Sequence, residues 1–473
     1  MSITFGTEGW RAIIGEEFTA DNVRSVTQAI AEHVGAHAPA GLRSSLTMVI
    51  GYDTRFLSDY FAQAICEVLA GNGIRSVLTD RAVPTCAVSR SVVARRLPAG
   101  IMVTASHNPA IYNGMKVKES YGGSATPQTV ASIERRLGRS QAKRLPLDEA
   151  RRARLVRVTH LLPEFLRGIR SSVDIPTIRR STCRVVVDSM HGTGGRLIEG
   201  LLAGGSCRVE TIHAEPDPLF GGHAPEPIAS HLRALSATVL RRRASLGIAN
   251  DGDADRIGVI GPDGVWLSPG HIMCVLLQHL VTTRRAHGAV VKTVSNTMMI
   301  DRMTKALGLR LLEVPVGFKH IAKLMLDDDV LIGGEESGGI GVTSYLPERD
   351  GIFNGLLLLE AMATRGQGVG AIMRELERRY GRWYYSRHDL TLKPAQVHAL
   401  FKRLHAQTPD RLIGAPVAKV STLDGIKLIG RDDSWLLFRR SGTEPIVRIY
   451  AETPRRSHLN RLIAFGVRLA HTA

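Results

Sequence analysis

Apolar residues recur in three similar blocks over the first three quarters of the chain. Each block opens with a β-branched strand, continues through a helical stretch and a second strand, and closes on a third strand. Strands that alternate with helical segments indicate parallel or mostly parallel sheets, so the pattern predicts three tandem copies of one α/β unit. The strands are expected at residues 48–53, 74–78 and 101–103, at 185–189, 207–212 and 246–249, and at 290–293, 309–314 and 330–332.

Residues 379–473 depart from this repeat, since strand-like segments there outnumber helical ones. The chain as a whole predicts an α/β fold: three tandem mixed-sheet α/β/α domains of one topology plus a smaller C-terminal α+β domain, around a central cleft. The C-terminal strands are expected at 384–392, 435–439 and 446–451, and the helical stretches at 395–405 and 459–469. The expected domain limits are 1–150, 151–265, 266–378 and 379–473, with boundary stretches at 139–154 and 261–264.

Each third strand leads into a polar motif. These motifs are Thr104-Ala105-Ser106-His107-Asn108-Pro109, Asp251-Gly252-Asp253-Ala254-Asp255-Arg256 and Gly334-Glu335-Glu336-Ser337-Gly338-Gly339. Ligands collect at the carboxyl ends of strands in such sheets. Three domains are therefore expected to direct three loops at one shared cleft.

Length, hydropathy and cysteine content point to a cytoplasmic protein of several domains. Domains usually run to ~100–150 residues, so a chain of this length predicts three or four. No run of 18 apolar residues occurs, and the first residues lack the pattern of a signal peptide, so neither a membrane span nor secretion is expected. The five cysteines are widely spaced and include no Cys-x-x-Cys pair, which indicates free thiols in a reducing cytoplasm.

The net charge of +17 raises the question of a nucleic-acid partner. The densest basic stretches, 151–154 and 241–243, are short and are not interleaved with aromatic residues, which make up 5% of the chain. Nucleic-acid binding is therefore not expected. A positive field would instead steer a phosphorylated small molecule towards a cleft.

Ser106 is the candidate nucleophile. Pro109 disfavours helical backbone at Asn108, so the chain turns there and projects a hydroxyl. A lone serine at such a position is more often a helix cap or a turn residue. The Gly-x-Ser-x-Gly elbow of many hydrolases is absent, and His107 is expected to be poorly placed to serve Ser106 as a base.

Asp251, Asp253 and Asp255 are candidate metal ligands. Three carboxylates so close together repel one another unless a cation compensates them, and an oxygen-only ligand set favours Mg²⁺ over Zn²⁺. A calcium-binding EF-hand loop is excluded, because its sixth and twelfth positions would be Arg256 and Pro262. A solvated acidic turn is the alternative reading.

Three further groups are weaker signals by themselves. Glu335 and Ser337 follow a strand in a glycine-rich loop and can bind neighbouring sugar hydroxyls, although a structural turn explains them as well. Lys116 lies ten residues after Ser106, where a solvated surface lysine is the alternative. A tight loop between the last two strands combines arginines, hydroxyls and glycine, which suits phosphate as well as it suits a plain hairpin turn. This last group comprises Arg439, Ser441, Gly442, Thr443 and Arg448.

Five motifs in this order and at this spacing resemble the α-D-phosphohexomutase family over the whole chain. The three strand-end motifs are joined by Gly6-Thr7-Glu8-Gly9-Trp10-Arg11 and by Arg439-Arg440-Ser441-Gly442-Thr443-Glu444-Pro445. In that family the serine is carried as phosphoserine, which falls on Ser106 here. The resemblance further implies that a phosphoserine oxygen and the three aspartates bind Mg²⁺.

The resemblance also implies roles for the other candidates. Lys116 matches a general acid/base lysine, and Arg11 and Arg256 match arginines beside the transferring phosphate. The Ser-Gly-Thr loop matches the site of the phosphate that is not transferred. The implied substrate-binding residues are Lys292, Gly317, Lys319, Glu335, Ser337, Arg439, Ser441, Gly442, Thr443 and Arg448.

The implied reaction moves phosphate between O1 and O6 of glucose through a bisphosphate, with Mg²⁺ as cofactor and glucose 1,6-bisphosphate as activator. The third-domain loops are similar to those of phosphoglucomutases. Dual-specificity phosphomannomutase/phosphoglucomutases tend to carry histidine where Gly339 stands, and phosphoglucosamine mutases usually carry glutamine where Glu336 stands. The expected partners are small sugar phosphates, without nucleic acid or membrane, and the expected assembly is a monomer or homodimer.

Two alternatives remain open at this point. The first is a phosphomannomutase or dual-specificity mutase of the same family. The second is a non-catalytic sugar-phosphate sensor on the same fold, because a fold alone does not establish an activity. The serine, the lysine and the aspartate triplet argue against a sensor, which needs neither a nucleophile nor an acid/base.

Overall fold

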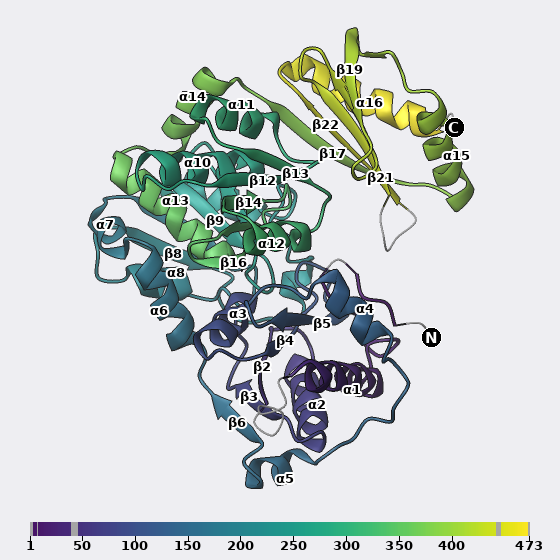
Figure 1. Ribbon diagram of the computed structural model, residues 1–473. Helices are drawn as coiled ribbons and strands as arrows, with labels where there is room; N and C mark the ends of the chain where they lie inside the picture. Colours follow the sequence, from purple (N-terminus) through teal and green to yellow (C-terminus); the bar gives the residue numbers. More distant parts are fainter. Residues whose placement is uncertain (1–2, 7, 39–45, 441–445, 472–473) are drawn as a thin grey trace.

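The computed structural model describes residues 3–6, 8–38, 46–440 and 446–471 and folds them into four sheets with covering helices (Figure 1). The unit built on the first sheet lies at the bottom of that view. The second and third units lie together above it, and the fourth, in yellow and green, lies at the upper right. The expected fold class, three α/β units followed by a smaller sheet domain, is confirmed.

The first sheet has six strands in the order β1-β5-β4-β2-β3-β6. Strands β2, β3, β4 and β6 are parallel neighbours, whereas β5 runs antiparallel to β4 and to β1. The strands of this unit are β1 (Trp10–Ile13), β2 (Thr47–Tyr52), β3 (Arg75–Thr79), β4 (Ala99–Val103), β5 (Tyr112–Glu119) and β6 (Val156–Thr159). Its helices are α1 (Ala20–His37), α2 (Ser58–Gly71), α3 (Thr85–Ala94), α4 (Pro127–Glu134) and α5 (Leu147–Arg152).

The second and third sheets repeat the middle of the first, which confirms the threefold pattern. Their orders are β11-β10-β9-β7-β8 and β13-β12-β14-β15-β16, and in each the first three strands along the chain are parallel. The second unit contains α6 (Leu162–Ser172), α7 (Ile175–Arg180), β7 (Arg184–Asp188), α8 (Leu197–Leu202), β8 (Arg208–Ile212), α9 (Arg233–Arg242), β9 (Leu246–Asn250), β10 (Ile257–Ile260) and β11 (Trp266–Leu267). The third contains α10 (Pro269–Thr282), β12 (Ala289–Thr293), α11 (Met298–Leu307), β13 (Leu311–Val314), α12 (Phe318–Asp327), β14 (Val330–Gly334), β15 (Ile340–Val342), β16 (Leu346–Arg349), α13 (Gly351–Arg365) and α14 (Val369–Tyr380).

The fourth sheet is antiparallel throughout, in the order β17-β22-β21-β20-β19-β18. Helix α16 packs against β22 and β17, and α15 packs against α16. The unit contains β17 (Tyr384–Thr391), α15 (Pro394–Ala406), β18 (Arg411–Leu412), β19 (Ala415–Ser421), β20 (Ile426–Gly430), β21 (Trp435–Arg440), β22 (Ile446–Thr453) and α16 (Arg456–His471).

The boundary stretches expected from the sequence are corrected by the sheets. Strand β6 pairs with β3, so the first sheet continues past residue 150. Strand β11 pairs with β10, so residues 261–264 form a hairpin turn inside the second sheet, closed by the Gly261 N–H donating to the Val265 carbonyl. Polar, glycine-containing turns look alike in sequence whether they join strands or domains. The four domain ranges, 1–150, 151–265, 266–378 and 379–473, remain predictions.

One apolar core joins the first three units. Buried side chains of α3 and α6 continue into those of the second and third sheets and of α13. Helix α13 is capped at its amino end by Asp350, whose carboxylate accepts the Phe353 N–H, and at its carboxyl end by Gly366, which has a positive φ of 60°. Because nearly all of α13 is buried, the helix that follows the third sheet also covers strands of the second. The loops at the carboxyl ends of these strands are thereby fixed relative to one another.

Candidate active site

The loop after β4 places Ser106 in an unusual backbone conformation. Ser106 has a φ of 52°, in the left-handed region, and is fully buried. Its N–H donates to the Thr104 hydroxyl at 2.9 Å, and that hydroxyl donates to Asp53 at 2.5 Å. Arg55 donates to the carbonyl of Ser106 at 2.7 Å and to that of Asn108 at 2.6 Å. Asp53 and Arg55, which directly follow β2, therefore hold the turn in place, a role that was not predicted from the sequence.

The serine hydroxyl of the first unit meets the aspartates of the second. Ser106 Oγ donates to Asp251 Oδ2 at 2.7 Å. A Cβ on Gly252 would lie 2.7 Å from the Ser106 carbonyl oxygen, so the glycine allows the two loops to approach this closely. His107 Nδ1 lies 3.4 Å from Ser106 Oγ, which corrects the expectation that this histidine is poorly placed. Burial, followed by nearby Arg256, lowers the pKa of His107 well below its usual value.

The three aspartates form a site suited to a cation. Asp251, Asp253 and Asp255 are fully buried and each offers one oxygen within 4.8 Å of the others. Burial, and then repulsion by the other two carboxylates, raises the pKa of Asp251 well above its usual value. Within the described part of the chain, Asp253 Oδ1 and Asp255 Oδ1 have no hydrogen-bond partner. Unpaired buried oxygens of this kind are costly unless a ligand satisfies them, so the residues fit Mg²⁺.

Lys116 supplies part of the compensating charge. It lies on β5, fully buried, with Nζ 2.6 Å from Asp253 Oδ2 and 2.6 Å from Asp255 Oδ2. Burial alone would lower the pKa of Lys116, but the two carboxylates outweigh it and raise the pKa above its usual value. Each of these aspartates thus directs one oxygen at the lysine and leaves the other free.

Two predicted arginines flank the serine. Arg11 donates to the Asn108 side chain at 2.7 Å and lies 3.7 Å from Glu8. The Arg256 N–H donates to Asp251 Oδ1 at 3.1 Å, and its guanidinium lies 4.0 Å from Asp251. Burial first, and then the proximity of Arg256, act to lower the pKa of Arg11, so the two guanidiniums lie in one region of the site. Such a region suits a phosphate group.

Arg349 connects the first three units and was not predicted from the sequence. The fully buried guanidinium forms an ion pair with Glu8, donates to Asp255 at 2.7 Å and lies 3.4 Å from Glu335. A Cβ on Gly339 would lie 2.3 Å from Arg349 Cδ, so that glycine provides the space for the arginine. The only sequence signal was a charged run, Glu348-Arg349-Asp350, directly before an apolar helix.

The third-unit loop after β14 contributes Glu335. Its carboxylate accepts the Gly317 N–H at 3.0 Å, and burial raises its pKa to about 7. Ser337, two residues further along this loop, and Lys319, two residues after Gly317, are both half-buried. Lys292 lies elsewhere: it is buried and donates to Asp301 of helix α11. Its assignment to the substrate site remains a prediction without a supporting contact.

The fourth unit presents two of its predicted phosphate ligands on neighbouring strands. Arg439 and Arg448 are direct cross-strand partners on β21 and β22. Arg439 donates to Asp424 at 2.7 Å, and Asp424 also accepts the Val316 N–H at 2.8 Å. Asp424 thus connects the third-unit loop that contains Val316 and Gly317 to the predicted phosphate site. Ser441, Gly442 and Thr443 lie outside the described residues.

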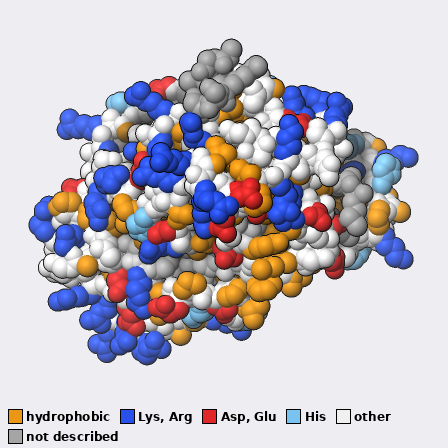
Figure 2. Space-filling view, turned by 90° about the horizontal axis from the view of Figure 1, so that it is seen from below, with side chains coloured by type: hydrophobic (Ala, Val, Ile, Leu, Met, Phe, Trp, Pro, Cys, Tyr) orange, Lys and Arg blue, Asp and Glu red, His pale blue; other side chains and the backbone are white. Residues whose placement is uncertain are grey.

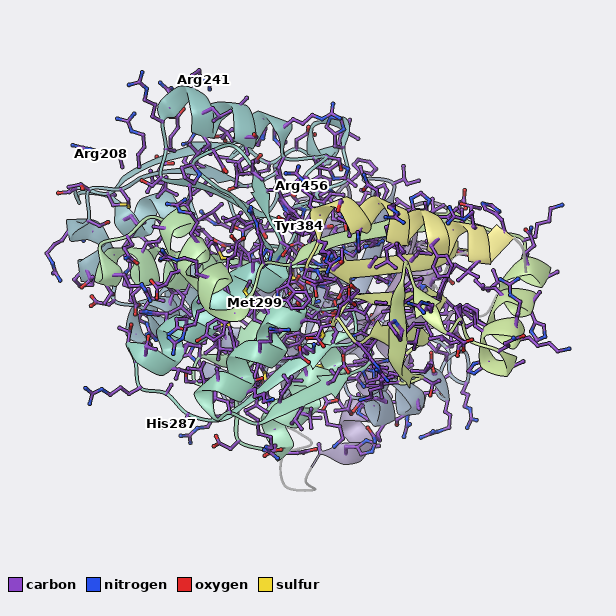
Figure 3. All side chains as sticks on the ribbon, turned by 90° about the horizontal axis from the view of Figure 1, so that it is seen from above. Arg208, Arg241, His287, Met299, Tyr384 and Arg456 are labelled. Atoms are coloured by element: carbon purple, nitrogen blue, oxygen red, sulfur yellow. The ribbon has the colours of Figure 1, made fainter. Side chains whose placement is uncertain are left out.

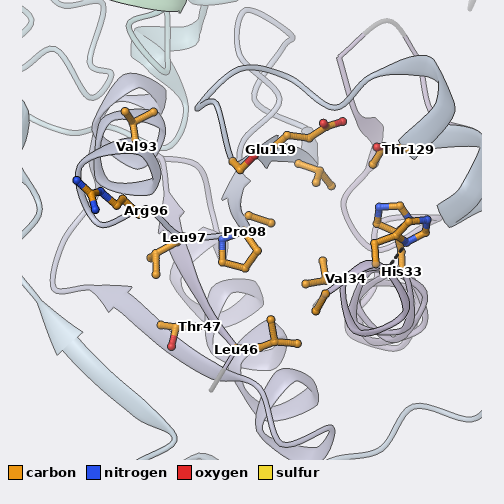
Figure 4. A pocket seen from close by; sticks show the side chains of 15 residues that line it. His33, Val34, Leu46, Thr47, Val93, Arg96, Leu97, Pro98, Glu119 and Thr129 are labelled. Atoms are coloured by element: carbon orange, nitrogen blue, oxygen red, sulfur yellow. Dashed lines mark hydrogen bonds between the residues drawn. The ribbon is translucent and has the colours of Figure 1, made fainter. Parts of the chain in front are cut away.

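A separate cavity of 620 Å³ lies in the first unit (Figure 4). Val34, Leu46, Val93, Leu97 and Pro98 line it, with His33, Arg96 and Glu119 at its margin. It opens at the amino ends of β2 and β4, whereas Ser106 follows the carboxyl end of β4. The cavity is therefore not part of the site that contains the serine and the aspartates.

Basic side chains are spread over the surface. Figure 2 shows Lys and Arg at several separate places on one face, with acidic and apolar side chains between them. In the described ranges, no helix is both long enough and apolar enough to cross a membrane.

Models of known families match three quarters of the chain. The phosphoglucomutase/phosphomannomutase α/β/α domain I matches residues 2–144, domain II matches residues 163–264, and domain III matches residues 268–380. The chain belongs to this family of α-D-phosphohexomutases, whose enzymes are isomerases. The resemblance inferred from the five motifs is confirmed.

Individual relatives differ in the sugar that they are named for. The chain is 28% identical to a phosphoglucomutase/phosphomannomutase of Thermococcus kodakarensis, covering 100% of this chain and 99% of the relative. It is also 28% identical to a phosphoglucosamine/phosphogalactosamine mutase of Sulfurisphaera tokodaii, covering 98% of each. The crystal structure of a putative phosphomannomutase from Thermus thermophilus superposes with a TM-score of 0.86 at 33% identity, covering 100% of this chain and 99% of that one.

Proposed function

We propose that this phosphohexomutase interconverts glucose 1-phosphate and glucose 6-phosphate through phospho-Ser106 and a bisphosphorylated sugar. The observation that supports this most directly is the contact of Ser106 Oγ with Asp251 at 2.7 Å. It brings a nucleophilic hydroxyl, a cation site and two arginines into one buried place. Phosphoryl transfer needs positioning and charge neutralisation more than covalent chemistry from the protein, and this arrangement offers both.

The proposed metal site consists of Asp251, Asp253, Asp255 and the oxygen of Ser106 or its phosphate. Bound Mg²⁺ would neutralise charge on the transferring phosphoryl group. Arg11 and Arg256 are proposed to hold the same group, because Arg11 contacts Asn108 in the Ser106 turn and Arg256 lies beside Asp251, which the Ser106 hydroxyl contacts. The N–H of Arg256 also fixes the orientation of Asp251.

Proton exchange is assigned to Lys116. When the phosphoryl group moves from Ser106 to a sugar hydroxyl, that hydroxyl loses a proton and the serine oxygen gains one. Lys116 enters this cycle protonated, because two carboxylates raise its pKa, and the same carboxylates fix its direction. General acid/base catalysis by a positioned lysine fits this geometry.

Recognition of the sugar is proposed to involve the loops after β14 and before α12. Glu335 and Ser337 would bind neighbouring hydroxyls, with Gly317 and Lys319 beside them. The second phosphate would be held by Arg439, Arg448 and the Ser441–Thr443 loop. Glucose 1,6-bisphosphate would then act as the activator that phosphorylates Ser106.

Glucose is favoured over mannose by the packing at Gly339. A histidine there, as in dual-specificity members, would need Arg349 to move, since a Cβ already falls 2.3 Å from its Cδ. A phosphomannomutase or dual-specificity activity is the alternative of the same class. The free cysteines support the proposed cytoplasmic location, and the assembly, a monomer or homodimer, remains as expected from the sequence.

Rates measured side by side on glucose, mannose, ribose and glucosamine 1-phosphates test the substrate. The proposal expects the highest kcat/KM with glucose 1-phosphate and a modest loss with mannose 1-phosphate. A clearly better rate with any other sugar would overturn it.

A second set of measurements tests the role of Ser106 as phosphoryl carrier and distinguishes a mutase from a non-catalytic sugar-phosphate sensor. Mass spectrometry of active protein should find phosphate on the Ser106 peptide, and Ser106→Ala should abolish turnover. Ser89→Ala, which removes another buried hydroxyl of the same unit, is the control and should keep its activity. Sugar-phosphate binding without turnover in the unmodified protein would favour the sensor instead.

A further inference from the structure

Two cysteines of the second unit lie sulfur to sulfur, away from the site described above. Cys183 Sγ and Cys207 Sγ are 2.9 Å apart. The residues immediately precede β7 and β8, which are parallel neighbours with Arg184 opposite Arg208. The Arg208 N–H donates to the Cys183 carbonyl at 2.9 Å, which fixes the two backbones at this point. Adjacent strands bring Cα atoms to within the range that a disulfide spans.

The two thiols differ in environment. Cys183 is half-buried, and its sulfur lies 3.1 Å from the Ser181 hydroxyl, whereas Cys207 is 4% exposed. Hydrogen bonds from the Cys207 thiol, and then from Ser181, lower the pKa of Cys183 to about 6. The same contact raises the pKa of Cys207 above its usual value. A more exposed thiolate beside a buried thiol is the arrangement of an attacking and a resolving cysteine.

The other three cysteines provide a contrast within the same chain. Cys66, Cys86 and Cys274 are fully buried. Burial raises the pKa of Cys66 to about 12 and also raises the pKa values of Cys86 and Cys274. Thiols in such surroundings react slowly with oxidants.

We propose that Cys183 and Cys207 form a peroxide-reactive dithiol that closes to a cross-strand disulfide. The Cys183 thiolate attacks one oxygen of hydrogen peroxide; an S–O bond forms, the O–O bond breaks, and the departing hydroxide takes up a proton to give water. The Cys207 sulfur then attacks the Cys183 sulfenic acid; the S–S bond forms, the S–O bond breaks, and the hydroxide leaves as water with the Cys207 proton. Two thiols and one peroxide thus give one disulfide and two waters.

The position of the pair indicates what the disulfide does. β8 is an edge strand of its sheet, and Arg208, next to Cys207, lies at the outer edge of the molecule on the side away from the fourth unit (Figure 3). The thiols lie at the amino ends of β7 and β8, whereas the aspartate triplet follows the carboxyl end of the parallel strand β9. Five-residue strands separate those ends by about 16 Å. The disulfide therefore secures an edge strand without entering the active site.

The test oxidises the intact, reduced protein with a small excess of hydrogen peroxide and maps its peptides without reduction. The expected product is one intramolecular link between Cys183 and Cys207, with the other three thiols unreacted and mutase activity unchanged. In Cys207→Ser, dimedone should trap a sulfenic acid at Cys183, roughly tenfold faster than at any other cysteine. Cys183→Ser should leave Cys207 reduced under the same treatment.

Control variants distinguish a specific reaction of the Cys183–Cys207 pair from general oxidation of the cysteines. Cys66→Ser should form the Cys183–Cys207 link at the rate of the unmodified protein. Recovery of the pair reduced after peroxide treatment, links only between molecules, or dimedone labelling of Cys183 no faster than of Cys66 would each overturn the proposal. Disulfide formation in the native protein followed by loss of turnover would overturn its placement outside the active site.

Discussion

The first three units and the fourth unit are held together by different kinds of contact. A continuous apolar core runs from α3 of the first unit through α6 and the second and third sheets. The fourth unit meets the third mainly through polar groups. Lys427 donates to the Val294 carbonyl at 2.6 Å and to Glu313 at 2.9 Å, and the Met298 N–H donates to Glu452 at 2.8 Å. The apolar cluster at this junction is small.

This difference indicates that the fixed part of the site and the fourth unit have different roles in the reaction. Ser106, the aspartates and Lys116 lie in the part fixed by the apolar core, as a preorganised reaction centre requires. Arg439 and Arg448 belong to the unit with the polar junction, which can open at lower cost. Substitutions in the fixed part should therefore lower kcat, whereas those in the fourth unit should mainly raise KM.

The largest effect is expected from the metal site. Asp253→Asn removes a negative charge from the cation site and should lower kcat by about 10⁴-fold. Mg²⁺ should raise the melting temperature of the unmodified protein, because a ligand that binds the folded state stabilises it. That shift should disappear in the variant.

Two observations would contradict the metal assignment. The first is full activity of the unmodified protein in excess chelator. The second is a Mg²⁺-dependent stabilisation that Asp253→Asn leaves unchanged. The first would show that Lys116 and the arginines are sufficient to compensate the three carboxylates, and the second would show that Mg²⁺ binds elsewhere.

Lys116→Met should lower kcat by about 10³-fold with a smaller change in KM, since general acid/base groups usually contribute in this range. Lys118→Met is a matched control. Lys118 lies two residues along the same strand, is equally buried and pairs with Glu348 instead of the aspartates. If both variants lose the same activity, the loss reflects a buried, unpaired carboxylate. A larger loss in His107→Gln would assign the proton exchange to the histidine near Ser106.

The sequence predicted the strands and the strand-end motifs well because both have local signals. The apolar strands before Ser106, Asp251 and Glu335 were each found, and the structure brings Ser106 and Asp251 into contact. Long-range partners had no such signal. Arg349 meets Glu8 across 341 residues of chain, and no local pattern distinguishes a buried interdomain arginine from a surface one.

The errors have equally local causes. The turn at residues 261–264 was predicted to be a domain boundary, because its glycines suit a hairpin turn and an interdomain linker equally well. The assignment of Lys292 to the substrate site is not among these errors: it rests on the resemblance alone and stays a prediction, which the ion pair with Asp301 does not test. Asp53 and Arg55 were missed, since an Asp-x-Arg pair after a strand is common and only the fold directs it at the turn containing Ser106.

The next prediction concerns Glu335, which lies in the proposed sugar-binding loop of the fixed part of the site. Glu335→Ala should lower kcat/KM by roughly 50-fold on glucose and mannose phosphates alike, because a paired sugar hydroxyl would lose its acceptor. Burial raises the pKa of Glu335 to about 7. A carboxylate only accepts hydrogen bonds, so kcat/KM should fall as pH decreases through about 7 and the group takes up a proton.

Glu335→Gln is the control for this pH dependence. It keeps the shape of the side chain but cannot titrate, and comparison in the same buffers cancels the titration of the substrate phosphate. The kcat/KM of the unmodified protein divided by that of Glu335→Gln should therefore rise between pH 6 and 8. A constant ratio, or unchanged glucose 1-phosphate turnover in Glu335→Ala, would remove Glu335 from sugar binding.

The smallest effect is expected in the fourth unit. Arg448→Ala should raise KM by about tenfold and leave kcat nearly unchanged, because a charged hydrogen bond to phosphate is worth roughly 1.5–3 kcal/mol and is made before and during transfer alike. Arg440→Ala is the control: this exposed arginine on the same sheet lies over the Phe401 ring and should leave both constants unchanged. A fall in kcat as large as that of Lys116→Met would place Arg448 at the transferring phosphate. It would also contradict the proposal that the reaction centre lies in the fixed part of the site while the fourth unit binds the phosphate that is not transferred.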